Sequence, residues 1–190
     1  MAKILVVIGP SGVGKSTLFG PLRREGLVQL VPTWTTRKPR HYEDPANADH
    51  VFVDDEEFSA RERDGFFLET AQLFGLQARY GLPRQALQSD GGRIRVLMMR
   101  AMLVQRLSRY FPTHVVYQVE APRARVEAHL RTRLERDGDI GSRLAGFEDE
   151  LQMGRPLAQR IVDNSQAPAL AQAQLRAWLR EDFAESGMTA

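Results

Sequence analysis

The sequence predicts a three-layer α/β domain in which helices cover both faces of a central parallel sheet. Two observations support this fold class. The segment Lys3–Ile8 is a short, continuous apolar run rich in β-branched residues, which is typical of a strand buried on both faces of a parallel sheet. Further strand-like segments then alternate with segments of helical periodicity. The 190 residues suit one domain, whose apolar core must form without disulfides because the chain contains no cysteine.

The chain opens with an expected strand, loop and helix. The strand Lys3–Ile8 ends at Gly9, and the helix Ser16–Glu25 follows because its apolar residues fall on one side. A second short strand is expected at Leu27–Val31. These elements begin the central sheet and its first covering helix.

The middle of the chain is expected to be less regular. Thr33–Asp49 is polar and rich in proline and arginine, which predicts a loop. Val51–Val53 reads as a short strand, and Asp54–Asp64 as a helix with an acidic first turn. Phe66–Leu68 is a further apolar run, and Pro83–Ser89 predicts a helix with proline in its first turn.

The remainder returns to alternating strands and helices. A strand is expected at Arg93–Met98, a helix at Arg100–Tyr110, and a strand at the β-branched, alternating segment Thr113–Val119. A helix opens at Pro122, carries Val126, Leu130 and Leu134 on one stripe, is interrupted at Asp137–Gly141, and is followed by another helix through about Met153. The last elements are a strand at Arg160–Val162 and an amphipathic helix at Leu170–Phe183.

The composition limits the partners that we expect. The 26 basic and 24 acidic residues leave a formal net charge of only +2, which gives no reason to propose a nucleic-acid partner. No segment is long and apolar enough to predict a membrane span. We therefore expect no nucleic acid and no membrane among the partners, a cytoplasmic location, and a monomer or homodimer.

A glycine-rich loop follows the first strand. Gly9-Pro-Ser-Gly-Val-Gly-Lys-Ser16 fits the pattern G-x-x-x-x-G-K-[ST] without a mismatch. In this pattern glycines let backbone N–H groups approach phosphate oxygens, the lysine reaches the β- and γ-phosphates, and the serine hydroxyl faces Mg²⁺. The loop predicts a P-loop NTPase fold that binds ATP with Mg²⁺, the metal at Ser16. Its expected phosphate-binding residues are Gly9, Ser11, Gly12, Val13, Gly14, Lys15, Ser16 and Thr17.

A second informative stretch is Thr33-Trp-Thr-Thr-Arg-Lys-Pro-Arg40. Its two arginines are three residues apart, with Pro39 between them and hydroxyl groups before them. Guanidinium forks of this kind suit a phosphate monoester, since each can donate two hydrogen bonds to one oxyanion. Taken alone, the stretch slightly favours the interpretation as a solvated basic loop.

The order of these segments closely resembles guanylate kinases. A phosphate loop is followed by Thr-Thr-Arg-x-Pro-Arg, then by Asp49-His-Val-Phe52 and by Phe67-Leu-Glu69. The resemblance extends over nearly the whole chain and is strongest from Lys3 to Tyr80. It implies a single domain over 1–190, with a core at 1–32 and 90–190, an acceptor-binding insertion at about 33–89 and a lid at about 131–143.

The resemblance also implies roles for individual residues. Arg37 and Arg40 would hold the acceptor's phosphate with Tyr80, and His50 stands where the family has a tyrosine that contacts this phosphate. Thr33 takes the place of a serine that touches the guanine oxygen, and Glu69 that of the carboxylate that accepts hydrogen bonds from guanine N1 and N2. The expected catalytic residues are Lys15 and two lid arginines, Arg133 and Arg143.

The sequence departs from the family after the strand that precedes Arg100. Guanylate kinases have an Asp-x-Asp pair there, whereas this chain reads Val96-Leu-Met-Met-Arg-Ala-Met102, and Leu76-Gln-Ala-Arg79 appears as an added stretch before Tyr80. The related ribose 1,5-bisphosphate phosphokinases also lack the acidic pair, but they do not keep the glutamate at Glu69. The sequence therefore predicts ATP-dependent transfer to GMP or dGMP. The alternatives are ribose 1,5-bisphosphate as acceptor, which would give phosphoribosyl diphosphate, and a binding domain without catalysis.

Overall fold

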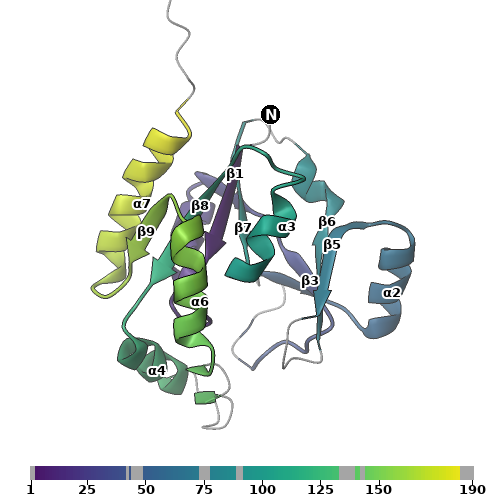
Figure 1. Cartoon of the computed structure of the whole chain (residues 1–190), viewed down its shortest axis with the longest axis horizontal. Helices are drawn as coiled ribbons and strands as arrows, with labels where there is room; N and C mark the ends of the chain where they lie inside the picture. The colour runs from purple at the N-terminus through teal and green to yellow at the C-terminus, as the bar shows by residue number, and fades with distance from the viewer. Residues whose placement is uncertain are drawn as a thin grey trace, which may run out of the picture.

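The computed structural model describes residues 3–41, 43, 49–72, 78–88, 92–132, 140–141 and 144–184. Its central sheet has five strands in the order β2-β7-β1-β8-β9, and every neighbouring pair is parallel. The strands are β1 (Lys3–Ile8), β2 (Val28–Leu30), β7 (Ile94–Met98), β8 (His114–Glu120) and β9 (Arg160–Asp163). Figure 1 shows β1 at the middle of this sheet, as its continuous apolar sequence predicts.

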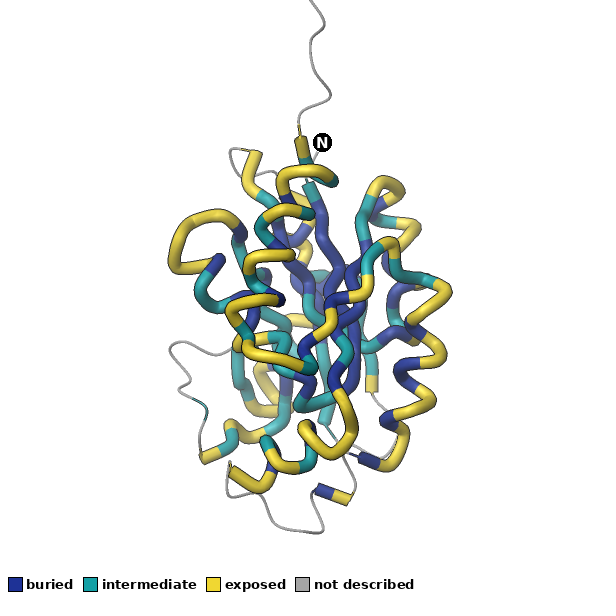
Figure 2. The backbone as a smooth tube through the Cα atoms, turned by 90° about the vertical axis from the view of Figure 1, so that its left-hand side faces the viewer, coloured by how far each residue is buried: buried dark blue, intermediate teal, exposed yellow. Residues whose placement is uncertain are grey.

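The two faces of β1 belong to different parts of the core. Leu5 and Val7 pack with α1 (Lys15–Arg24), α4 (Arg123–Thr132), α6 (Phe147–Gly154) and α7 (Pro168–Asp182). Ile4, Val6 and Ile8 pack with residues of α3 (Val104–Leu107) and of the second sheet. The central strands are buried and the surrounding helices alternate between buried and exposed turns (Figure 2). This arrangement confirms the predicted α/β class.

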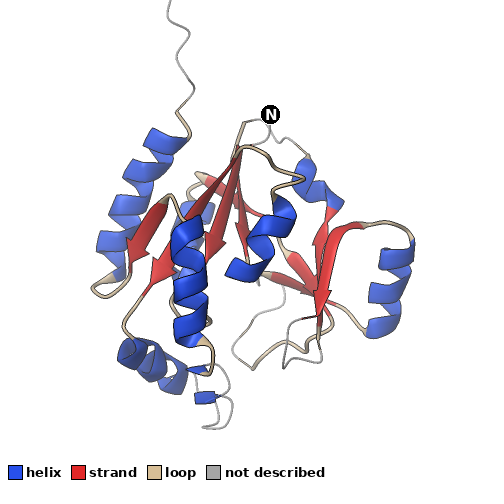
Figure 3. Ribbon diagram, in the orientation of Figure 1, coloured by secondary structure: helices blue, strands red, loops and turns tan. Residues whose placement is uncertain are grey.

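A smaller sheet lies beside the central one (Figure 3). Its order is β4-β3-β6-β5, with β3 (Thr33–Thr35) parallel to β4 (His50–Phe52) and β6 (Arg79–Pro83) antiparallel to both β3 and β5 (Phe67–Gln72). The helix α2 (Asp55–Arg63) begins where its acidic first turn predicts, because the Asp54 carboxylate accepts a hydrogen bond of 2.8 Å from the backbone N–H of Glu57. Phe58 of α2 is fully buried and stacks on Phe67 of β5, with ring centroids 4.7 Å apart.

Two strands of this sheet were not predicted. The expected loop Thr33–Asp49 begins with β3, and β6 ends at Pro83 in a segment where no strand was expected. Both segments are short and lack an apolar alternation, and β3 obtains its regular structure from pairing on both sides. Residues 42 and 44–48 of the expected loop lie outside the described part of the chain.

Two predicted helices were too long. Instead of a helix over Pro83–Ser89, the structure has a 3₁₀ turn, η1 (Arg84–Leu87). Instead of a helix over Arg100–Tyr110, it has the 3₁₀ turn η2 (Ala101–Leu103) followed by the single turn of α3. The backbone N–H of Ala101 donates a 2.8 Å hydrogen bond to the Glu150 carboxylate of α6, a distant partner that local periodicity does not reveal.

The C-terminal half otherwise follows the prediction. Val126 and Leu130 of α4 are buried on one stripe, whereas Leu134 lies outside the described residues, as does most of the interruption Asp137–Gly141. The helix α6 is followed by the 3₁₀ turn η3 (Arg155–Leu157), which leads into β9. Across the described ranges, no helix is both long and apolar enough to cross a membrane.

Candidate active site

The glycine-rich loop connects β1 to α1 at the carboxyl edge of the central sheet, where ligands bind in open parallel sheets. Gly14 has a φ of +98°, and a Cβ atom there would lie 2.4 Å from Nδ2 of Asn164. Gly14 also precedes α1 without a side-chain cap from the described residues, so the first backbone N–H groups of the helix remain available to an anion. The loop is therefore shaped for phosphate.

Asn164 supports this loop from the end of β9. Its side chain is buried and donates a 2.7 Å hydrogen bond to the carbonyl of Val13, while its own N–H bonds the Glu120 carbonyl at 2.8 Å. These contacts make Asn164 a support of the phosphate loop.

Lys15 curls back over the loop. Its ammonium group donates to the carbonyl oxygens of Gly9 at 2.5 Å and Pro10 at 3.1 Å. Burial, and then the charge of Arg100, lower the pKa of Lys15 from 10.5 to about 8, against the opposing carboxylates of Glu150 and Asp49. A phosphate oxygen is an anion that would favour the charged form of this buried cation.

Ser16 follows Lys15 and donates a hydrogen bond to the carboxylate of Asp49. A serine hydroxyl and a carboxylate are both oxygen ligands of the kind that Mg²⁺ takes. Among the described residues no group of three or more histidines and acids gathers for a metal ion, so a metal here depends on phosphate oxygens and water for its remaining ligands. The residues therefore fit a nucleotide-bound magnesium ion rather than a site made by protein alone.

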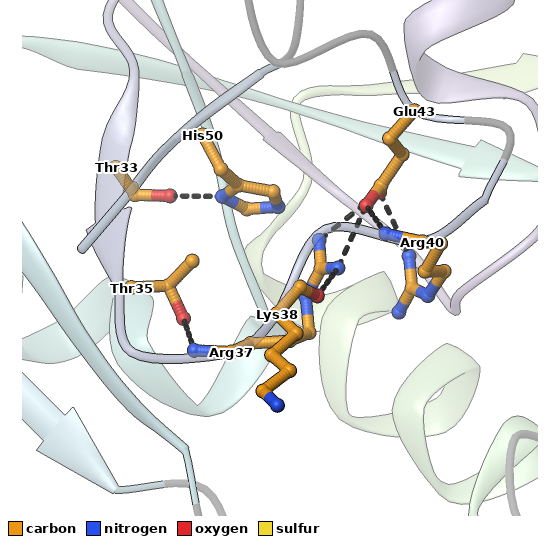
Figure 4. A network of polar contacts seen from close by, with 7 residues as sticks. All are labelled: Thr33, Thr35, Arg37, Lys38, Arg40, Glu43 and His50. Carbon is orange, nitrogen blue, oxygen red and sulfur yellow. Dashed lines mark hydrogen bonds and ion pairs between the residues drawn. The ribbon is translucent and has the colours of Figure 1, made fainter. Parts of the chain in front are cut away.

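Asp49 directly precedes β4, so its contact with Ser16 connects the second sheet to the phosphate loop. The next residue, His50, contacts Thr33 across the second sheet, with 2.7 Å between Nδ1 and Oγ1 (Figure 4). Burial and then the nearby Arg37 cation lower the pKa of His50 below its usual value. The rings of His50 and Tyr80 are 6.0 Å apart, which brings these three predicted acceptor residues together.

The two predicted acceptor arginines share one carboxylate, that of Glu43 (Figure 4). Arg37 binds it in a bidentate manner, at 2.7 Å and 3.0 Å, and Arg40 donates to it from its side chain at 3.0 Å and its backbone N–H at 2.9 Å. Although burial opposes it, the hydrogen bonds from Arg37 and Arg40 hold the pKa of Glu43 below its usual value. Tyr80 also interacts with Arg37.

Glu69 lies on β5 of the second sheet, and its side chain contacts α3 of the core. A β-bulge between Phe67 and Glu69 shifts the register of β5 against β6, and bulges of this kind re-aim side chains. The Glu69 carboxylate forms ion pairs with Arg106 of α3, at 3.4 Å, and with Arg109 just beyond it. The hydroxyl of Tyr110 reaches the same carboxylate at 3.5 Å.

Arg100 stands at the end of β7, beside the phosphate loop. The register pairs Met98 with Val7, and the backbone N–H of Met99 bonds the Val7 carbonyl at 3.0 Å. Arg100 lies 3.4 Å from the buried carboxylate of Glu150. The end of β7 thus holds a cation beside the phosphate loop.

Sequence reasoning missed several members of this site: Glu43, Glu150, Arg106 and Arg109, together with the contact of Asp49. Only Glu43 had a local signal, because it follows Arg40 at a spacing of three residues. The others act across 33 to 50 residues of chain. The predicted lid arginines, Arg133 and Arg143, lie outside the described residues.

A phosphate loop between β1 and α1 and a second sheet carrying paired arginines are features of P-loop kinases that act on a phosphorylated acceptor. Comparison with known proteins agrees. The family described as guanylate kinase matches residues 1–133. The chain belongs to the guanylate kinase family.

Individual relatives include both candidate acceptor classes. A guanylate kinase of Thermosynechococcus vestitus is 33% identical over 167 residues, covering 85% of this chain and 86% of the relative. The ribose 1,5-bisphosphate phosphokinase PhnN of Acidiphilium cryptum is 31% identical over 174 residues, covering 89% and 87%. The crystal structure of guanylate kinase from Anaplasma phagocytophilum shares the fold, with a TM-score of 0.72, 24% identity, and 97% of this chain and 88% of that chain covered.

Proposed function

We propose that this chain transfers the γ-phosphoryl group of ATP to GMP or dGMP. The observation that carries the proposal is the meeting of donor and acceptor groups around two adjacent residues. Asp49 contacts Ser16 of the phosphate loop, and His50 contacts Thr33 of the acceptor set. A cytoplasmic location, where ATP is abundant, goes with this proposal.

The residues would act by position and charge. The loop from Gly9 to Thr17 would bind the ATP phosphates, and Lys15 would place a cation at the group that moves. Magnesium, held at Ser16 and the phosphates, would supply further charge neutralisation. Arg37, Arg40 and Tyr80 would fix the acceptor phosphate so that its oxygen meets the γ-phosphorus in line, while Arg133 and Arg143 would add positive charge for the transferring group.

A second acceptor, ribose 1,5-bisphosphate, is favoured by two specific contacts. The Glu69 carboxylate, which would read guanine, is engaged by Arg106 and Arg109. Arg100 adds positive charge beside the phosphate loop, where a more anionic acceptor would gain from it. A binding domain without catalysis is less well supported, because Lys15 and Ser16 keep their places at a complete phosphate loop.

A phosphotransfer assay with Mg-ATP tests the acceptor. GMP, dGMP, AMP, CMP, UMP and ribose 1,5-bisphosphate are supplied one at a time, and ADP formation is measured. We expect turnover with GMP and dGMP. Turnover with the sugar bisphosphate and none with GMP would select the second acceptor. If no acceptor in the panel increased ADP formation, both proposals would be refuted.

A further inference from the structure

We propose that Glu43 determines acceptor specificity by competing, within the chain, for the arginines that bind the acceptor phosphate. The inference rests on the proposed function only in that the acceptor carries a phosphate monoester, which is true of both candidate acceptors. It assigns to Glu43 a role that neither the family motifs quoted above nor the predicted site contains.

The Glu43 carboxylate contacts the two arginines as a bound oxyanion would. Its two carboxylate oxygens accept four hydrogen bonds of 2.7–3.0 Å, all from Arg37 and Arg40. Three come from guanidinium groups and one from a backbone N–H, which is the donor set that oxyanions select in proteins. The carboxylate is the chemical equivalent of two oxygens of a bound phosphate.

The burial of this group shows that the contact is more than a surface ion pair. The side chains of Glu43 and Arg37 are only 17% and 13% exposed. Arg37 is further fixed by its approach to the ring of Phe52, at 5.0 Å from the centroid. Paired charges that are desolvated in this way hold their geometry far better than exposed ones.

The carboxylate does not use every donor in the site. Nε of Arg37 is buried and has no hydrogen-bond partner within the described part of the chain. A carboxylate has two oxygens and one charge, whereas a phosphate monoester offers three terminal oxygens and close to two charges at neutral pH. The third oxygen can accept from this unused donor, so phosphate gains where the internal carboxylate cannot.

This difference sets a threshold for the acceptor. A tethered carboxylate is present at a high effective concentration, so free carboxylates and other monoanions cannot displace it. A phosphate monoester displaces it by exceeding it in charge and in hydrogen bonds. Glu43 therefore excludes weaker anions because its carboxylate already occupies the arginines. The same occupation lowers the affinity for the true acceptor, which has to displace the carboxylate.

Glu43→Gln is the direct test, because the amide keeps the shape of the side chain but loses its charge and one acceptor oxygen. We expect the affinity for GMP, ribose 1,5-bisphosphate and inorganic phosphate, measured by calorimetry, to rise by about tenfold, while the affinity for ATP stays unchanged. Glu57→Gln is the matched control, since Glu57 forms an exposed ion pair with Arg61 on α2. The melting temperature of each variant establishes that it is folded.

Acetate separates competition from a purely structural role of Glu43. In a Glu43→Ala protein, which removes the carboxylate and leaves its place empty, added acetate should refill that place and weaken phosphate binding, while the wild-type protein should not respond. If Glu43 only supports the arginines, the variant should bind phosphate more weakly, and acetate should improve its binding. That opposite result, or unchanged binding of all three probes, would overturn the inference.

The experiments distinguish a failure of the Glu43 competition from a failure of the GMP assignment. Tighter phosphate binding in the variant without GMP turnover by either protein would refute the GMP assignment and leave the competition intact. GMP turnover with unchanged phosphate affinity in the variant would refute the competition and leave the GMP assignment intact. No binding of any phosphate probe to either protein would refute the competition directly.

Discussion

At the scale of single residues, Lys15 is the best-defined member of the phosphate loop. Its ammonium group is held against the carbonyls of Gly9 and Pro10, and burial makes its charged form costly. Arg100 adds to that cost, whereas Glu150 and Asp49 reduce it. An incoming phosphate removes the cost, so the residue couples nucleotide binding to its own protonation.

A proton-linked binding measurement follows from this pKa. Above pH 8, a growing share of Lys15 is neutral in the free protein, and bound ATP restores the charged form. We expect ATP binding at pH 8.5 to take up protons and its affinity to fall as pH rises further. Calorimetry in buffers of different ionisation enthalpy measures this uptake.

The same residue provides the control. Lys15→Met should abolish both the proton uptake and phosphotransfer, whereas Arg23→Ala, which removes an exposed charge from the same helix, should change neither. Proton uptake that persisted in Lys15→Met would show that another group titrates.

At the scale of elements, the contact between β5 and α3 determines whether Glu69 can serve the acceptor. Arg106 and Arg109 are both exposed, at 52% and 60%, while Glu69 is only 17% exposed. A guanine that used this carboxylate would have to displace two cations from it.

Removing the two cations tests this competition. Arg106→Ala with Arg109→Ala should lower the melting temperature modestly, because the arginines are exposed but the Glu69 carboxylate that loses them is only 17% exposed. If GMP is the acceptor, kcat/KM for GMP should rise severalfold, and adding Glu69→Gln should cancel the gain. A fall in GMP turnover would instead mean that the arginines themselves hold the acceptor.

At the scale of the whole molecule, the two sheets bring together groups that are far apart in sequence. Ser16 and Asp49 are 33 residues apart, and Arg100 and Glu150 are 50 apart. Because a bound nucleotide would contact several of these groups at once, it should stabilise the native molecule as a unit.

We therefore expect Mg-ATP to raise the melting temperature. A ligand at one hundred times its Kd adds about 2.7 kcal/mol to the free energy of unfolding. Differential scanning fluorimetry with millimolar Mg-ATP measures the shift, and Lys15→Met should reduce it strongly. A wild-type protein that did not respond would contradict the kinase assignment.

How much of this could be predicted differs between the two sheets. The central sheet and its phosphate loop were predictable because their signals are local: a continuous apolar strand, glycines at fixed spacing, and a helix directly after them. The strands β3 and β6 were not, since these short segments carry no strand periodicity of their own and gain regular structure from pairing with each other and with their neighbours.

The sequence by itself determined the class of protein and predicted the donor site, because a phosphate loop is made from consecutive residues whose backbone conformation their own types favour. It also predicted the acceptor arginines, through the resemblance carried by Thr33–Arg40. Only the tertiary structure decided what those residues contact. Glu43 lies on the acceptor arginines and Glu69 on α3, and a charged side chain takes its partner from whatever folding brings within reach.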